Sequence, residues 1–347
     1  MRGTTMKNNL FTYATSELSQ DAFICWLASY ALEGAKTDFA LQECAKEMLA
    51  MFVPELRGQA FTLSEVQRQV QHIDVLLTVH ASNGCYKIIV EDKTYTREHD
   101  NQLQNYLTMI RKICPGCMVR GVYYKTGFQS DLSAAEEAGY TIITRSQILQ
   151  LMRKYVPLTQ NQIYLDYFEY WDNFQKETEQ YRHLPVSKWG WKQINGFYDH
   201  VKTSNFLSQR NLWMGYDYVA NRNGGFYGLW AGINNHQICV NGDFYELYLQ
   251  METFAGYPSF AQLCLKLSAV GSNKDKSKIR VARDRLIYSD KGTYNLGKYN
   301  FRKPARLAIG QHMTLGIYSA DLSDYEAVLC ALDLACKDYV SLIKELQ

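Results

Sequence analysis

Residues 71–93 read QHIDVLLTVHASNGCYKIIVEDK, and this stretch decides the fold of the N-terminal half of the chain. Residues 71–79 and 86–91 are rich in β-branched and apolar residues, a composition typical of strands. The turn cluster at 81–84 predicts that the two strands form a hairpin. The apolar centre of the second strand indicates burial on both faces, which predicts a central position in a sheet.

Helical and strand patterns alternate around this hairpin. We expect helices over 18–30 and 38–52 before it, and helices through 103–110, 132–138 and 146–154 after it. Strands are expected at 118–124 and 140–144 between those later helices. This mixed order predicts an α/β sandwich around a partly antiparallel sheet.

The second half of the chain has a different pattern. An aromatic helix through 164–174 is expected to link the halves, and short strands at 212–220, 226–233, 237–240 and 244–252 predict an antiparallel meander. We also expect a helix over 257–267, a strand over 307–318 and a closing helix from 325. The predicted domains are 1–157, a linker helix over 158–182, and an α+β domain over 183–347.

Composition excludes several classes of protein. The chain has 347 residues, of which 47% are hydrophobic and 21% charged, so it can bury a core and is not disordered as a whole. No apolar run is long enough to span a membrane. The nine scattered cysteines and the lack of a signal-peptide pattern predict a cytoplasmic protein whose cysteines act as small apolar residues. Cys114 and Cys117 have CxxC spacing, but no second pair follows, so zinc is not expected.

Charged residues end the hairpin. Glu91 and Lys93 are two apart in the second strand, so their side chains point to the same face of the sheet, and Asp92 points to the other. Asp74 lies on the first strand, and pairing across the turn brings it within reach of Glu91. Two neighbouring carboxylates are unfavourable unless a cation neutralises them, and hard oxygen ligands suit Mg²⁺ or Mn²⁺.

Gln102 and Tyr106 follow at positions i and i+4 of the next helix, so they share one helix face. The short connection over 94–101 brings this face back over the strand ends. A lysine beside a metal can orient water and stabilise negative charge, an arrangement suited to phosphodiester hydrolysis. Taken singly, these residues also fit an ion pair, a turn cap and a helix surface, but their combined order favours the catalytic interpretation.

The succession of Asp74, Glu91-x-Lys93 and Gln102-x-x-x-Tyr106 resembles the PD-(D/E)xK nuclease superfamily. The last element resembles the QxxxY of its RecB-like branch, and residues 91–106 are especially similar to poorly characterised bacterial members. The resemblance covers about residues 10–155 and implies a restriction-endonuclease-like αβ sandwich core with a mixed sheet. Ile73 replaces the proline that names the motif, which threatens little because proline has no catalytic group.

The resemblance also implies a role for each residue. Asp74 and Glu91 ligate the metal with the backbone carbonyl of Asp92, and Lys93 activates water or stabilises the transition state. The two residues of the QxxxY element position the site or the nucleic-acid backbone. Glu17 precedes the first helix, where related nucleases often carry a further acidic metal ligand, and we assign it to the metal as well.

The formal net charge of +2 hides an uneven distribution. Residues 274–306 hold eleven basic and three acidic residues, a balance of +8, so the remaining residues sum to −6. Interleaved aromatic residues suit phosphate contacts with base stacking, although a solvated loop without a ligand fits the same pattern. The candidate nucleic-acid-binding residues are Lys274, Lys276, Lys278, Arg280, Arg283, Arg285, Arg302 and Lys303.

These features predict a two-domain nuclease that depends on Mg²⁺, with Mn²⁺ as the alternative ion. DNA is favoured over RNA by the resemblance alone, and so is a role in bacterial defence, restriction or repair. The competing hypothesis is a non-catalytic or ligand-gated nucleic-acid-binding sensor on a nuclease-like scaffold, against which the intact Asp74, Glu91 and Lys93 argue. A homodimer, and a protein or small-ligand trigger at the C-terminal domain, stay open.

Overall fold

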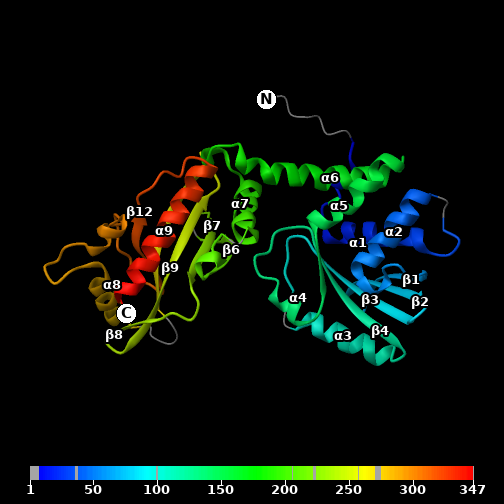
Figure 1. The fold of residues 1–347 in the computed structure, drawn as a ribbon, viewed down its shortest axis with the longest axis horizontal. Coiled ribbons are helices and arrows are strands. Elements are labelled where there is room, and N and C mark those ends of the chain that lie inside the picture. Colours follow the sequence, from blue (N-terminus) through cyan, green and yellow to red (C-terminus); the bar gives the residue numbers. More distant parts are fainter. Residues whose placement is uncertain are drawn as a thin grey trace. The chain divides into compact units, whose positions relative to one another are not determined.

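The chain forms two compact units, residues 1–175 and 176–347, in a computed structural model (Figure 1). The structure describes residues 8–35, 38–98, 101–204, 206–221, 224–256, 258–269 and 275–346. The division falls inside one helix, α6 (Gln162–Glu179), which begins in the first unit and ends in the second.

The first unit is an α/β sandwich. Its sheet has the order β1-β2-β3-β4-β5, in which β1, β2 and β3 are antiparallel neighbours and β3, β4 and β5 are parallel. The mixed sheet confirms the predicted fold class. The elements are α1 (Glu17–Ala28), α2 (Phe39–Phe52), β1 (Phe61–Val70), β2 (Ile73–Ala81), β3 (Gly84–Lys93), α3 (Gln102–Ile113), β4 (Cys117–Lys125), α4 (Ser133–Glu137), β5 (Thr141–Thr144) and α5 (Arg145–Tyr155).

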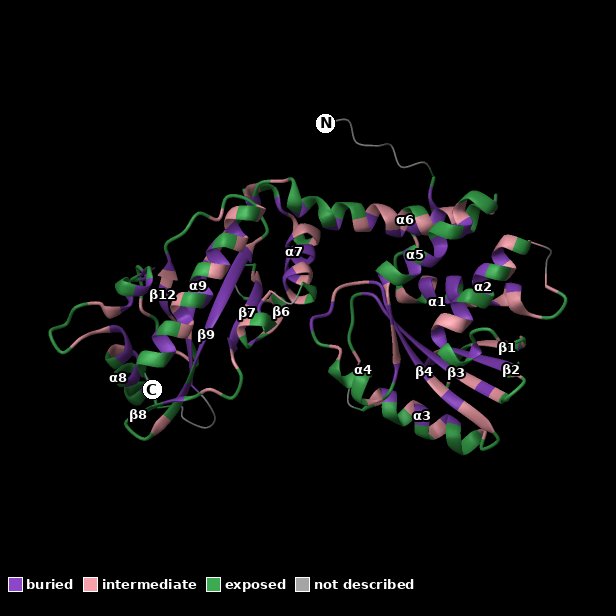
Figure 2. Ribbon diagram, in the orientation of Figure 1, coloured by how far each residue is buried: buried purple, intermediate pink, exposed green. Residues whose placement is uncertain are grey.

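Two hydrophobic cores cover the two faces of this sheet. The larger core joins α1, α2, α5 and α6 to one face, and the smaller joins α3 and α4 to the other. Strand β3 is buried along its second half, as its apolar centre predicts, and Figure 2 shows buried residues along β3 and β4. The carboxyl end of β3 therefore lies between two layers of helices.

Strand β1 was not predicted. The strand is an edge strand that pairs only with β2, so half of its residues are exposed and polar, and buried and exposed positions do not alternate regularly. A two-residue turn, Gln71–His72, links β1 to β2, and both residues have positive φ angles, 53° and 68°. Such turns usually contain asparagine and glycine, so the sequence lacks the common signal for this hairpin.

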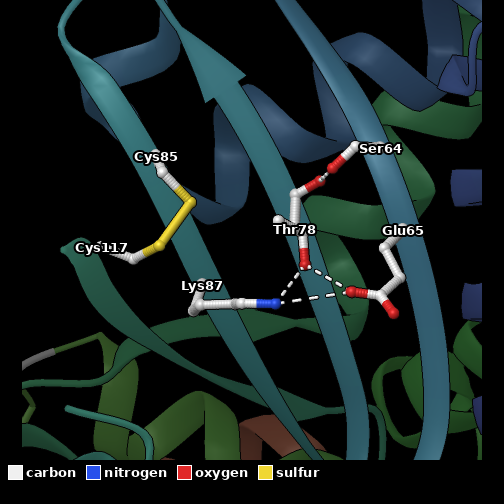
Figure 3. Close-up of a disulfide and its surroundings, with 6 residues drawn as sticks. All are labelled: Ser64, Glu65, Thr78, Cys85, Lys87 and Cys117. Atoms are coloured by element: carbon white, nitrogen blue, oxygen red, sulfur yellow. Dashed lines mark hydrogen bonds and ion pairs between the residues drawn. A yellow bond between two sulfur atoms is a disulfide. The ribbon is translucent and has the colours of Figure 1, made fainter. Parts of the chain in front are cut away.

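Cys85 and Cys117 form a disulfide between β3 and β4 (Figure 3). The two cysteines face each other in the parallel register, with 4.8 Å between their Cα atoms. The prediction that the cysteines act only as small apolar residues is wrong for this pair. Cys85 is 32 residues from Cys117, and only the strand register places the two side by side.

The second unit is built on a second, antiparallel sheet, which confirms the predicted meander. Its strand order is β11-β12-β10-β9-β7-β6, and β8 pairs with β9. Helix α7 packs on β6 and β7, and α9 packs on β9. The elements are α7 (Trp191–Thr203), β6 (Leu212–Val219), β7 (Phe226–Ile233), β8 (Ile238–Val240), β9 (Asp243–Phe254), β10 (Phe260–Ala269), α8 (Lys276–Ile287), β11 (Phe301–Arg302), β12 (His312–Tyr318) and α9 (Tyr325–Leu346).

Two expectations for this unit are corrected, and one helix was not predicted. The helix expected over 257–267 is wrong: residues 260–269 form strand β10, whose leucines fit both helical and strand spacing, and Tyr257 lies outside the described residues. The strand expected from 307 begins at His312. Helix α8 occupies part of the basic segment, for which no helix was predicted.

Candidate metal and catalytic centre

The predicted motif residues meet at the carboxyl end of β3. Glu91 is fully buried, and its Oε1 lies 2.6 Å from Lys93 Nζ on the same face of the strand. Asp74, on the neighbouring strand β2, accepts a hydrogen bond from the backbone N–H of Asp92 through Oδ2 at 2.9 Å. The hairpin therefore brings the two acidic elements of the motif together with the lysine.

Helix α3 adds the next pair of predicted residues. Gln102 Nε2 donates to Glu91 Oε1 at 2.9 Å and to the Tyr106 hydroxyl at 2.8 Å. The Tyr106 hydroxyl in turn donates to the carbonyl of His72, in the turn before β2, at 2.8 Å. Gln102 and Tyr106 thus tie the helix to Glu91 and to the hairpin that carries Asp74.

Glu17 occupies a different position from the other predicted residues. Its Oε1 accepts hydrogen bonds from the backbone N–H of Thr94 at 2.8 Å and the hydroxyl of Thr96 at 2.8 Å. Burial raises the pKa of Glu17, but these hydrogen bonds and the nearby Lys93 outweigh it, so the pKa lies below its usual value. Glu17 therefore anchors the segment that follows β3, and its carboxylate is directed at backbone N–H groups.

Asp21 was not predicted, although it lies one helical turn after Glu17 on the same face of α1. Its side chain is only 1% exposed, and Oδ2 accepts from Gln69 Nε2 at 3.1 Å. Burial, followed by the charge of Asp74, raises the pKa of Asp21 to about 7. Asp21 is therefore the α1 carboxylate that lies beside Asp74.

Asp92 points to the opposite face of the sheet, as predicted from strand alternation. It is fully buried, Gln20 Nε2 donates to its Oδ1, and its Oδ2 has no hydrogen-bond partner. Burial raises the pKa of Asp92 well above its usual value. Since the side chain faces away from Glu91, only the backbone of Asp92 is available on the motif side.

The carboxylates of Glu91 and Asp74 lie close together at the carboxyl end of β3, and the pKa of each is raised. Burial raises the pKa of Glu91 to about 7, with a further contribution from Asp74, and burial also raises the pKa of Asp74. Burial alone lowers the pKa of Lys93, but Glu91 more than compensates, and the pKa lies above its usual value. Lys93 is therefore protonated at neutral pH.

The donor set suits a hard cation. Glu91 Oε2 and Asp21 Oδ1 are buried carboxylate oxygens without a hydrogen-bond partner, and oxygens of this kind are what Mg²⁺ and Mn²⁺ prefer. In the described part of the chain, no three His, Cys, Asp or Glu side chains are grouped closely enough to hold an ion as they lie. Nitrogen donors of Lys93 and Gln69 contact these carboxylates instead.

Lys125 is a second buried lysine near the site that was not predicted. It lies opposite Lys93 in the parallel register of β3 and β4, and its Nζ donates to the carbonyl of Thr96 at 2.8 Å. Burial lowers the pKa of Lys125 to about 8. No sequence signal marks it, because its proximity depends on the pairing of strands that are separated by α3.

The predicted basic residues are divided between the surface and the interior of the second unit. Lys276 and Arg280 are exposed on α8, where Lys278 Nζ lies 3.3 Å from Asp243 and Arg285 donates to Asn241 at 2.8 Å.

Arg283 is only 8% exposed and donates to the carbonyls of Leu307 and Ala308 at 3.2 and 3.4 Å. Arg283 therefore serves the packing of α8. Arg302 is exposed on β11, Lys303 lies over the ring of Tyr288, and Lys274 lies outside the described residues.

The family model of the PD-(D/E)XK nuclease superfamily matches residues 6–183, just over half of the chain. The chain therefore belongs to this superfamily, as the motif resemblance predicted. No curated protein and no solved structure matches the chain. No helix among the described residues is both long enough and apolar enough to cross a membrane.

Proposed function

We propose that the protein is a Mg²⁺-dependent deoxyribonuclease that hydrolyses phosphodiester bonds at the carboxyl end of β3, with Mn²⁺ as the alternative ion. The observation that carries this proposal is the hydrogen-bonded network of Asp74, Glu91, Lys93, Gln102 and Tyr106. Membership of a nuclease superfamily supports it.

Asp74 and Glu91 would hold the cation, helped by the backbone carbonyl of Asp92. We add Asp21, because its unpartnered Oδ1 and its proximity to Asp74 suit a ligand better than Glu17, whose Oε1 already accepts backbone hydrogen bonds. When bound, the cation would polarise the phosphate and lower the pKa of the attacking water.

The two roles considered for Lys93 can be separated on electrostatic grounds. Glu91 and Asp74 raise the pKa of Lys93, so its side chain is a cation in the metal-free site. We therefore assign it to stabilising the negative charge that develops on the phosphate. Gln102 holds Glu91 in place through its hydrogen bond to Oε1.

The substrate would be DNA, and exposed basic residues of α8 and β11 would contact its phosphates. A cytoplasmic location and a role in bacterial defence, restriction or repair stay predictions, as do a homodimer and a trigger that binds the second unit.

The test is cleavage of plasmid, linear and single-stranded DNA, and of RNA, with Mg²⁺, Mn²⁺ or chelator. The parent should cut DNA only with a metal, and Glu91→Gln and Lys93→Ala should each lower the cleavage rate by at least about 100-fold.

Lys87→Ala and Glu65→Gln are matched controls. This pair lies on the same sheet face as Glu91 and Lys93, but toward the opposite end of β3. The two side chains are 3.5 Å apart, and both form hydrogen bonds with Thr78 (Figure 3). These variants should cut like the parent. DNA binding without cleavage in the parent would instead favour the non-catalytic sensor, and full activity of Lys93→Ala would contradict the assigned site.

A further inference from the structure

Gln69 is the residue of the β1–β2 hairpin that contacts the acidic site. Its Nε2 donates to Asp21 Oδ2 at 3.1 Å and to Asp74 Oδ1 at 3.3 Å. One amide nitrogen thus lies between two carboxylates that come from α1 and β2. In the described residues no second nitrogen donor bridges the same pair.

The backbone around Gln69 is built to direct this side chain. Gln69 has a φ of 55°, and Gln71 and His72 in the adjacent turn are also left-handed. Residues other than glycine, asparagine and aspartate adopt this conformation at a cost on the order of 1 kcal/mol. The Tyr106 hydroxyl bonds the carbonyl of His72, so α3 helps to hold the turn in place. Three of the four residues 69–72 therefore have left-handed backbone beside these carboxylates.

An amide is a weak counterpart for two carboxylates. It carries a partial positive charge, whereas a divalent cation carries two full charges and takes six or more oxygen ligands. The amide occupies one oxygen of each carboxylate, Asp21 Oδ2 and Asp74 Oδ1, and a cation held between Asp21 and Asp74 would need the same two carboxylates.

We propose that Gln69 is a positioning residue that stands in for the cation: its amide bridges Asp21 and Asp74 in the metal-free protein and releases them when the metal binds. The Gln69 amide therefore competes with the metal and sets the metal affinity of the site. This inference rests on the proposed metal-dependent nuclease, because it assumes that Asp21 and Asp74 are ligands.

The decisive variant is Gln69→Asn in the full chain. Asparagine tolerates the left-handed backbone, but its side chain is one methylene shorter and cannot reach both carboxylates. Gln71→Asn is the matched control, because Gln71 is exposed in the adjacent turn, has a φ of 53° and makes no hydrogen bond to either carboxylate. Glu91→Gln reports whether binding occurs at this site.

Mn²⁺ binding is measured by calorimetry without nucleic acid, and the melting temperature is measured with chelator and with Mn²⁺. Gln69→Asn should bind Mn²⁺ about tenfold more tightly than the parent, the effect of about one hydrogen bond to a charged group. It should also melt at a lower temperature in chelator and gain more from Mn²⁺. Gln71→Asn should match the parent in Mn²⁺ affinity.

Suppose that the parent binds Mn²⁺ and that Glu91→Gln abolishes this binding. If Gln69→Asn then binds Mn²⁺ equally well or more weakly than the parent, this inference alone is overturned, and Gln69 only stabilises the hairpin. The parent could also bind no Mn²⁺, or bind Mn²⁺ equally well after Glu91→Gln. In either case the metal-dependent function and this inference both fail.

Discussion

Glu91 and Asp21 are carboxylic acids that the fold removes almost completely from water, at 0% and 1% exposure. Burial raises the pKa of each to about 7, and Asp74 adds to the effect in both. A group with a pKa raised by this much costs folding free energy whenever it must ionise inside the protein. Two such costly carboxyl groups beside one strand end are expected of a site that binds a cation.

The metal-free protein should therefore become more stable as the pH falls from about 8 to about 5. In that interval the folded state holds protons on Asp21 and Glu91 that the unfolded state has released, so acidification favours folding. Above the folded pKa of about 7 the penalty is constant, and it reaches on the order of 3–4 kcal/mol for each group. Urea denaturation in chelator across this range measures the effect.

Asp21→Asn should remove the contribution of Asp21 to the pH dependence of stability, since asparagine does not ionise. At pH 8 in chelator the variant should be more stable than the parent, and the gain should disappear near pH 5. Glu43→Gln is a suitable control, because Glu43 forms an exposed ion pair with Lys46 on α2. A parent whose stability rises from pH 5 to pH 8 would contradict the assignment.

At the scale of the elements, the site depends on β3, α3 and β4 keeping their order. The disulfide between Cys85 and Cys117 closes the part of the chain that contains Glu91, Lys93 and all of α3. A crosslink of this kind stabilises a protein mainly by restricting the unfolded chain. It therefore secures the parallel pairing of β3 and β4 at the end of the strands opposite to the site.

Reduction of this disulfide should lower the free energy of unfolding by about 3–4 kcal/mol, the value for a closed loop of this length. Urea denaturation with and without dithiothreitol measures it. Cys85→Ser should have the lower stability in both conditions and lose the response to dithiothreitol.

Cys239→Ser, which removes an exposed free cysteine, should behave like the parent. An identical stability of the reduced and oxidised parent would show that the crosslink does not hold the strands.

At the scale of the whole molecule, the basic residues of the segment 274–306 fall into two groups, exposed and buried. Some of its residues are exposed on α8, whereas Arg283 is buried and bonds the carbonyls of Leu307 and Ala308. Neutralising all of them together would mix a loss of binding with a loss of folding. The two effects can be separated by choosing residues according to their exposure.

The double variant Lys276→Ala, Arg280→Ala should weaken DNA binding and lower its salt dependence by about one to two units of slope, without loss of stability. Arg283→Ala should instead lower the free energy of unfolding by about 1–3 kcal/mol, because the half-buried hydrogen bonds to the carbonyls of Leu307 and Ala308 lose their charged donor. Binding measured over a series of salt concentrations, with urea denaturation alongside, distinguishes them. An unchanged salt slope in the double variant would contradict a role for α8 in binding nucleic acid.

Local sequence patterns were sufficient to predict the α/β core, the hairpin of β2 and β3, and the meeting of Asp74, Glu91, Lys93, Gln102 and Tyr106. These residues lie on strands and a helix that follow one another directly, so alternation and helical periodicity determine which faces they share. Strand β1 and helix α8 were missed, because a half-exposed edge strand and a strongly basic helix both lack a clear apolar pattern.

The family, the order of the motif residues and the central place of β3 can all be recognised in local sequence patterns. Four further features are seen only in the folded chain: Asp21 and Gln69 join the site, Lys125 lies opposite Lys93, Cys85 pairs with Cys117, and Arg283 is buried. Each of these depends on strand register or helix packing between segments far apart in the chain. Such contacts arise from burial of the whole core, so local sequence patterns do not predict them.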